Sequence, residues 1–90
     1  MSSAWTIEFT PRAAKQLKKL DRVAAGRIVD TLTRDLARHD HPRDFGEALV
    51  GSWTGLWRYR VGDYRAICRI EEDVVTVYVI EVGHRREVYR

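Results

Sequence analysis

Arginines at alternate positions are the residues of this sequence best suited to chemistry. Arg58 and Arg60 are separated by one residue, so on a strand both side chains would point to the same face. Arg65 and Arg69 share a strand face with Ile67 in the same way. The guanidinium group is planar, always charged and suited to paired contacts with phosphate oxygens. We expect the arginines of the two strands to converge on a polyanion if the strands pair in register.

The end of the sequence adds more groups of the same kind. Three further arginines lie there, namely Arg85, Arg86 and Arg90. Tyr89 lies among them, and an aromatic ring can stack on an unpaired nucleobase. His84 is the histidine next to these arginines, and a neutral imidazole can accept a proton. These residue types indicate a surface for nucleic acid that carries a proton acceptor.

Each of these residues also has an ordinary structural explanation. The arginines can pair with carboxylates on a solvated surface, Tyr89 can pack at a sheet edge, and His84 can bond to backbone. The carboxylates in question are Asp63, Glu71, Glu72, Asp73, Glu81 and Glu87. A GC-rich genome would also explain thirteen arginines against three lysines. The residue types alone leave nucleic-acid binding and an ordinary charged surface both open.

The other reactive side chains do not suggest a second site. Cys68 is the one cysteine, so an internal disulfide is excluded, and its apolar neighbours predict a packed core residue. His39 and His41 lie in a predicted loop without a firm third ligand, so we expect no metal and no cofactor. The sequence shows no membrane-spanning stretch and no secretory signal. We expect one cytoplasmic domain over residues 1–90, with no membrane partner.

The first half of the chain predicts one strand and a pair of helices. Alternating aromatic and aliphatic residues predict a strand over 4–9, with Trp5, Ile7 and Phe9 on one face. Apolar residues then recur at helical spacing over 11–20 and 22–38. Their first turns would be capped by two residues with suitable side chains, Thr10 and Asp21.

The second half of the chain predicts three strands after a loop. Residues 56–61 alternate, Gly62-Asp63 is a two-residue hairpin signal, and 64–70 form the return strand. An acidic turn precedes a β-branched run over 74–82, which predicts a central strand. The order is therefore βααβββ, an α+β fold in which the N-terminal strand and helical hairpin pack with a mainly antiparallel four-stranded sheet.

Two stretches of the sequence resemble a known family. GLWRYRVGDYRAICRI and the ending EVGHRREVYR are similar to the RelE/ParE superfamily of toxin–antitoxin toxins, specifically its RelE branch. The resemblance covers nearly the whole chain. It implies a RelE-like, microbial ribonuclease-like fold and an endoribonuclease that cuts mRNA in the ribosomal A site and so inhibits translation. It also implies a cognate RelB-like antitoxin, with mRNA and the ribosome (16S rRNA) as further partners.

The resemblance further implies metal-free attack of the ribose 2′-hydroxyl on the adjacent phosphorus, which needs a base, cations and an acid. Arg58 and Arg60 match two alternating basic residues of a family strand. Arg65 and Arg85 match basic residues that bind the scissile phosphate. Tyr89 matches the C-terminal aromatic that stacks on the substrate base. Further substrate contacts are expected from Arg69, Arg86 and Arg90.

One departure from the family pattern concerns the base. The best-known relatives carry lysines on the alternating strand, whereas Arg58 and Arg60 stay protonated and are poor proton acceptors. Some relatives instead use a glutamate from the preceding loop with a C-terminal histidine. Glu47 and His84 resemble those two positions, so the base is expected to be one or the other.

Two other functional classes are alternatives. A ParE-type toxin, which poisons DNA gyrase without nuclease activity, has nearly the same fold. A non-catalytic RNA-binding domain would account for the charge alone. The matched arginines and the C-terminal tyrosine favour the nuclease, because gyrase poisoning has no evident need for a phosphate-binding cluster beside an aromatic residue.

Overall fold

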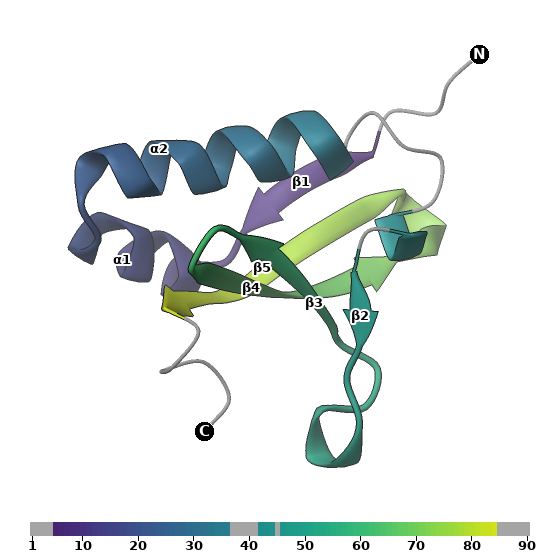
Figure 1. Ribbon diagram of the computed structural model, residues 1–90. Helices are drawn as coiled ribbons and strands as arrows, with labels where there is room; N and C mark the ends of the chain where they lie inside the picture. Colours follow the sequence, from purple (N-terminus) through teal and green to yellow (C-terminus); the bar gives the residue numbers. More distant parts are fainter. Residues whose placement is uncertain (1–4, 37–41, 45, 85–90) are drawn as a thin grey trace.

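The computed structural model describes residues 5–36, 42–44 and 46–84 of the chain (Figure 1). Within these residues, two α-helices and five strands follow the order β1, α1, α2, β2, β3, β4, β5. The predicted α+β class and the order of the predicted elements are confirmed. Predictions that concern the remaining residues lie outside the described part of the chain: His39, His41, Arg85, Arg86, Glu87, Tyr89 and Arg90.

The sheet has the strand order β1-β5-β4-β3-β2. β1 (Thr6–Phe9) runs parallel to β5 (Thr76–His84). The remaining pairs are antiparallel and involve β4 (Tyr64–Glu71), β3 (Trp57–Val61) and β2 (Glu47–Ala48). The mainly antiparallel sheet therefore has one strand more than the four predicted. The sequence predicts a loop where β2 lies, because two residues are too few to show alternation.

The two helices start where the sequence predicts. α1 (Pro11–Lys19) and α2 (Arg22–Thr31) are each preceded by a capping residue. The side-chain oxygens of Thr10 and Asp21 accept hydrogen bonds from backbone N–H groups of the first turns, at 3.2 and 3.1 Å. These bonds satisfy donors that a helix start otherwise leaves unpaired.

The end of the second helix differs from the regular helix predicted over 22–38. The chain continues after Thr31 as a π-helical turn over Leu32–Leu36. The Thr33 hydroxyl donates to the carbonyl of Val29 at 2.7 Å and to that of Asp30 at 3.3 Å. Those carbonyls thereby gain a partner other than the regular helical N–H, which favours a wider turn. Residues 37 and 38 lie outside the described range.

The helices and one face of the sheet enclose the hydrophobic core (Figure 1). Trp5, Ile7 and Phe9 all contribute to this side, as their alternation predicts. Burial raises the pKa of the Cys68 thiol and keeps it protonated, which agrees with its predicted core role. The other buried residues of this core come from both layers: Ala13, Ile28, Leu32, Tyr59, Val61, Ala66, Cys68, Val77, Val79 and Val82. We call the opposite side of the sheet the outer face.

The long last strand contains an irregularity that the sequence does not reveal. The pairing of β4 with β5 shifts between Ile67 and Cys68, which leaves Ile80 as an extra residue. Beyond this bulge, Glu81 and Gly83 lie on the outer face. The helix α1 covers the edge of this part of β5, where its Gln16 side chain accepts a hydrogen bond from a backbone N–H at 2.7 Å.

Of the two turns that flank β4, the one before it agrees with the prediction and the one after it does not. The β3–β4 hairpin turns at Gly62-Asp63 as predicted, and Gly62 has the positive φ of 60° that suits a glycine. β5 begins at Thr76 and not at the predicted residue 74. Glu72–Val74 form a 3-10 turn instead, and Val75 has a φ of 47°, which is unusual for a β-branched residue.

Candidate functional site

The outer face brings arginines of two neighbouring strands together. In the β3–β4 ladder, Arg60 lies directly opposite Arg65, and Arg58 lies opposite Ile67. Residues opposite one another share a sheet face, so the three guanidinium groups lie on the same side of the molecule. The short strand β2 adds Glu47, which pairs with Arg58. We call Glu47, Arg58, Arg60 and Arg65 the outer-face cluster.

The Glu47 carboxylate lies between two guanidinium groups. Its Oε2 is 2.6 Å from Arg58 Nη2, and its Oε1 is 3.3 Å from Arg60 Nη2. The Arg58 side chain is only 17% exposed, whereas Glu47 and Arg60 are more than half exposed. Both carboxylate oxygens are thus engaged, in an arrangement that equally suits two oxygens of a phosphate.

The electrostatics of the cluster keep this carboxylate charged. The hydrogen bond from Arg58 lowers the pKa of Glu47, and the positive charges of Arg58, Arg60 and Arg65 lower it further, against an opposing effect of desolvation. Glu47 is therefore ionised at neutral pH. The positive surroundings that hold one anion are available to another anion that displaces it.

An apolar residue lies beneath the charged groups. Ile67 is fully buried although it is on the outer face, with Arg58 opposite on β3 and Glu81 opposite on β5. A buried aliphatic floor excludes water from one side of the neighbouring guanidinium groups. Charge interactions there are consequently stronger than on a fully solvated surface.

Two other charged groups of the outer face are neutralised by neighbours within the chain. Arg69 lies 2.9 Å from a carboxylate oxygen of Glu71 and over the ring of Tyr78, 5.1 Å from its centroid. Glu81 lies 3.2 Å from Arg12 of helix α1. The surface pairing considered from the sequence therefore holds for Arg69 with Glu71, whereas Glu81 pairs with a helix arginine that the sequence did not suggest.

The structure places His84 with a different group of residues. It lies opposite Tyr64, and the two rings meet edge to face with centroids 5.8 Å apart. Tyr64 packs against the core, on the helix-facing side of the sheet, whereas Arg65 lies on the outer face. His84 is therefore not brought together with Glu47, the other predicted base.

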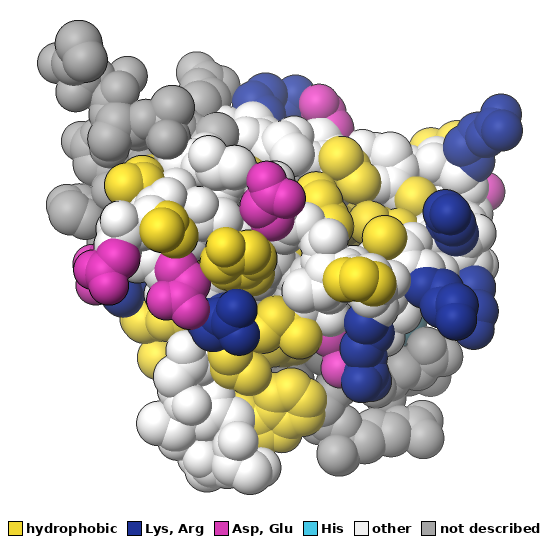
Figure 2. Space-filling model, turned by 180° about the vertical axis from the view of Figure 1, so that it is seen from behind, with side chains coloured by type: hydrophobic (Ala, Val, Ile, Leu, Met, Phe, Trp, Pro, Cys, Tyr) yellow, Lys and Arg dark blue, Asp and Glu magenta, His cyan; other side chains and the backbone are white. Residues whose placement is uncertain are grey.

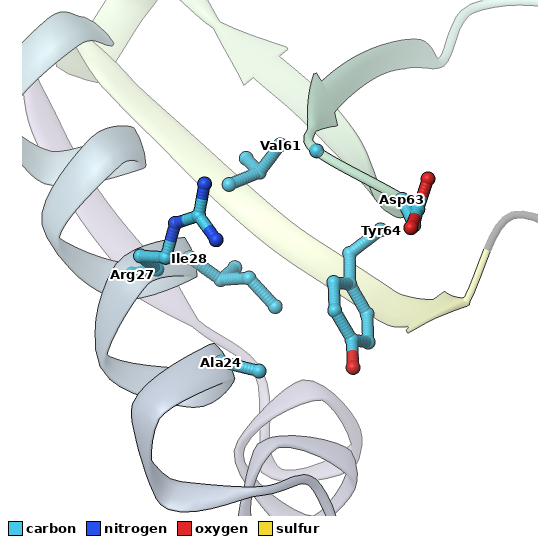
Figure 3. Close-up of a pocket in the computed structure, with 7 residues that line it drawn as sticks. Ala24, Arg27, Ile28, Val61, Asp63 and Tyr64 are labelled. Atoms are coloured by element: carbon cyan, nitrogen blue, oxygen red, sulfur yellow. The ribbon is translucent and has the colours of Figure 1, made fainter.

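The same side of the sheet contains a small cavity next to Tyr64 (Figure 3). It measures about 240 Å³ and lies between helix α2 and the β3–β4 hairpin. Arg27 and Asp63 lie on opposite sides of it, with Ile28 between the helix and the strands. This cavity is separated by the sheet from the outer-face cluster and contributes no group to it.

A second basic surface lies on the helices. Most lysines and arginines visible in Figure 2 gather on the side where α1 meets α2, away from the acidic residues on the other side of that view. The first helix has no acidic residue in its first turn and two lysines in its last turn. The exposed basic residues of this surface are Arg12, Lys15, Lys18, Lys19, Arg22 and Arg27.

Sequence reasoning missed a pocket that adjoins the cluster. Ala48, Leu49, Val50 and Trp53 line a depression of about 330 Å³ together with Arg58. The available signal was a tryptophan within a glycine-rich loop directly before the basic strand.

Among the described residues, no three His, Cys, Asp or Glu side chains are arranged to hold a metal ion. None of the described helices is long and apolar enough to cross a membrane.

Several known proteins are similar to this chain in sequence and in fold. The family described as the ParE toxin of the type II toxin–antitoxin system parDE matches residues 7–89. Toxin RelG of Mycobacterium tuberculosis is 33% identical over 86 residues, which cover 96% of this chain and 97% of that protein.

Solved structures of toxins have the same fold as this chain. A chain of the toxin–antitoxin complex RelBE2 from Mycobacterium tuberculosis has a TM-score of 0.86 and 30% identity, with 97% of this chain and 98% of that chain covered. The isolated RelE toxin of Escherichia coli has a TM-score of 0.69 and 26% identity, with coverages of 96% and 92%. The chain therefore belongs to the RelE/ParE superfamily of toxins from type II toxin–antitoxin systems.

Proposed function

We propose that this toxin is an endoribonuclease of the RelE type that cleaves mRNA in the ribosomal A site and thereby inhibits translation. The observation that carries the proposal is the Glu47 carboxylate between Arg58 and Arg60, with Arg65 across the ladder. The outer face thus already binds an oxyanion. Exchange of that carboxylate for an RNA phosphate needs no change in the strands that hold the arginines.

The proposed reaction is attack of a ribose 2′-hydroxyl on the adjacent phosphorus. The bond between phosphorus and the 5′-oxygen breaks, which leaves a 2′,3′-cyclic phosphate and a free 5′-hydroxyl. Arg58, Arg60 and Arg65 would stabilise the negative charge that develops on the phosphoryl oxygens. Fixed guanidinium groups supply the cations of this step, so the proposal assigns the protein no metal.

Glu47 is the base that the geometry favours over His84. While Arg58 binds it, the carboxylate has a lowered pKa and accepts a proton poorly. A phosphate that takes over the two guanidinium groups would remove the hydrogen bond that lowers this pKa. The released carboxylate would then be a stronger base next to the bound phosphate.

The other expected site residues complete the proposal beyond the described part of the chain. Arg85 would bind the scissile phosphate with Arg65, and Tyr89 would stack on the substrate base. Arg86 and Arg90 would add contacts to the RNA backbone, whereas the ion pair of Arg69 with Glu71 gives that arginine a smaller share. The acid that protonates the departing 5′-oxygen would also come from this C-terminal segment.

The partners follow from the same proposal. Solved structures with this fold include complexes of RelB antitoxins with RelE toxins, from Escherichia coli and Methanococcus jannaschii, which support an antitoxin partner for this chain. We assign it a cognate RelB-like antitoxin. The basic helical surface would face 16S rRNA when the cluster engages mRNA in the ribosome, a cytoplasmic setting (Figure 2).

Gyrase poisoning is the second candidate, because the matching family is described by its ParE toxin. A translation extract programmed with one defined mRNA separates the two, if supercoiled plasmid and DNA gyrase are tested alongside. Ribosome-dependent cuts within codons support the proposed nuclease. Intact mRNA together with broken plasmid would establish the gyrase poison instead.

A further inference from the structure

The pocket beside the outer-face cluster is built from an ordered loop. Leu49 donates its backbone N–H to Leu56 at 3.0 Å, and Leu56 donates to Trp53 at 3.1 Å. The Thr54 hydroxyl donates to the Gly51 carbonyl at 2.6 Å. These bonds fold residues 49–56 back on themselves beyond β2 and so form the pocket walls (Figure 1).

The walls of this pocket are apolar except on one side. Val50 is 81% exposed, more than any other exposed large hydrophobic residue in the described part of the chain. Trp53 contributes an indole, the one aromatic group among the lining residues. Arg58 forms the remaining wall, and its guanidinium also binds the Glu47 carboxylate at 2.6 Å. An apolar depression and an oxyanion site thus share one side chain.

We propose that this pocket binds a nucleobase of the RNA whose phosphate replaces Glu47 on Arg58. The inference rests on the proposed nuclease function and names a base subsite within it. A nucleotide joins a flat ring to a negative phosphate, which is the combination that a tryptophan-containing apolar pocket beside an arginine accommodates. The pocket volume of about 330 Å³ leaves room for a base.

The chemistry of the walls also predicts how selective the subsite is. Apart from Arg58, the lining side chains are apolar, so they offer contact and stacking but no hydrogen-bonding edge that could read a particular base. Stacking is tolerant of sequence, because every base has a π face. The subsite therefore contributes affinity and position for the flanking nucleotide more than codon choice.

The test uses binding of a probe that cannot be cleaved. A 2′-O-methyl dinucleotide is titrated into the full-length toxin, alongside two versions that lack either the 5′ or the 3′ base, and the indole N–H signal of Trp53 is followed by NMR. We expect removal of one of the bases to weaken binding about five-fold or more. The abasic version that lacks the critical base should also fail to shift the indole signal.

Two variants locate the effect, and a third serves as a matched control. Trp53→Ala and Val50→Ser should reduce the difference between the intact and abasic probes, with the larger reduction for Trp53→Ala. Val74→Ser removes an exposed valine far from the pocket, in the turn before β5, and should leave the difference unchanged. Val50→Ser replaces a side chain outside the core, so its result does not depend on whether Trp53→Ala folds.

Three results would overturn the proposal. In the first, both abasic probes bind the wild type as tightly as the intact dinucleotide. In the second, Val50→Ser and Val74→Ser behave alike. In the third, the pocket variants bind the probes normally but lose affinity for the antitoxin, which makes the pocket a protein-docking surface. Because the probe needs neither ribosome nor cleavage, these results are distinct from a failure of the nuclease proposal in the translation extract.

Discussion

A carboxylate bound by two guanidinium groups affects a phosphate site in two opposing ways. Glu47 occupies Arg58 and Arg60 in the free protein, so RNA must displace it before the phosphate can bind. Once displaced, the same carboxylate is the proposed base. Its removal should therefore improve binding and impair chemistry, a separation that a purely structural ion pair would not produce.

Glu47→Gln is the substitution that exposes this separation. We expect a lower KM for ribosome-bound mRNA, because the neutral amide competes less for the guanidinium groups. We also expect kcat to fall by about 10²- to 10⁴-fold, the usual contribution of a general base. Asp30→Asn is the matched control, since it removes a carboxylate paired with Arg34 at 2.9 Å on the helical layer. Unchanged kcat in Glu47→Gln would show that another group accepts the proton.

The ion pair of Glu47 should also make folding stability depend on pH. The pKa of this carboxyl in the folded protein is lowered from 4.5, mainly by the hydrogen bond from Arg58. Its contribution is therefore fully present above about pH 4.5 and is lost as the pH falls through the folded-state value. Urea denaturation of wild type and Glu47→Gln should show a stability difference that shrinks below pH 4.5. A difference that stays constant down to pH 3 would contradict the lowered pKa.

Arg65 has a separate consequence because it lies across the ladder from Arg60. Arg65→Ala should slow mRNA cleavage by about 10²- to 10³-fold, the typical loss for one preorganised charge donor. Its thermal unfolding should stay near that of the wild type, since the side chain lies outside the core. Arg34→Ala removes an arginine of the helical layer and should cleave normally. Equal cleavage rates for Arg65→Ala and Arg34→Ala would show that Arg65 takes no part in the reaction.

At the level of elements, the site depends on a two-residue strand and a glycine that allows it to pair. A Cβ atom at Gly46 would lie 2.9 Å from Tyr59 Cε1 and 3.0 Å from the Arg58 carbonyl oxygen. The Tyr59 ring is fixed by its hydroxyl, which donates to the Pro42 carbonyl at 2.7 Å. Gly46 thus permits the close approach that places Glu47 opposite Arg58.

Gly46→Ala should accordingly destabilise the protein by about 1–3 kcal/mol, the usual cost of overpacking. The same substitution at Gly26 is expected to stabilise the protein instead. A Cβ there meets nothing within 4 Å, and alanine is favoured over glycine within a helix by up to about 1 kcal/mol. Chemical denaturation of the two variants measures both effects. Similar stabilities would mean that the approach at residue 46 is not tight.

Local signals account for most of the elements but not for the parts that complete the site. Thr10 and Asp21 cap helices, and Gly62 turns a hairpin, because each rule involves residues that are adjacent in sequence. The strand β2 depends on pairing with residues nine and eleven positions away, and the bulge at Ile80 depends on the register of β4. Such long-range features leave no periodic pattern in one sequence.

The candidate site was likewise predictable from the sequence only in part. Strand alternation placed Arg58 with Arg60 and Arg65 with Arg69, and the observed register of β3 and β4 then brings Arg58, Arg60 and Arg65 to one face. Alternation says nothing about which carboxylate reaches them, so the position of Glu47 between two of them required the structure. The sequence groups His84 with the arginines, but the structure places it on the other face of the sheet. Neighbouring residues of a strand point to opposite faces, and the bulge in β5 determines which face each residue after it takes.

For the whole molecule, positive charge is concentrated on two separate surfaces. The formal net charge is +3 at pH 7, yet the outer-face cluster and the basic surface of α1 and α2 each concentrate positive groups. The proposed function assigns the mRNA to the outer-face cluster and a second polyanion, the rRNA, to the basic surface of the helices. Both contacts should weaken with salt, because phosphate binding releases counterions.

Binding of single-stranded RNA should report how many phosphates the outer face neutralises. If Arg58, Arg60 and Arg65 share one phosphate, as proposed for the scissile position, the cluster should contribute a slope of about −0.7 in a plot of the logarithm of affinity against the logarithm of salt. Arg60→Gln should weaken binding, whereas Arg34→Gln should leave both the affinity and the slope unchanged. A slope near zero in the wild type would show that the cluster does not bind the RNA backbone.

The most direct test of the nuclease is cleavage on the ribosome of an mRNA in which one A-site nucleotide lacks its 2′-hydroxyl. The wild-type toxin is predicted to cut the all-ribose message at that nucleotide, leaving a 2′,3′-cyclic phosphate and a 5′-hydroxyl, and to leave the 2′-deoxy message intact there. Equal cutting of both messages, or no cutting of either while translation stops, would contradict attack by the ribose hydroxyl.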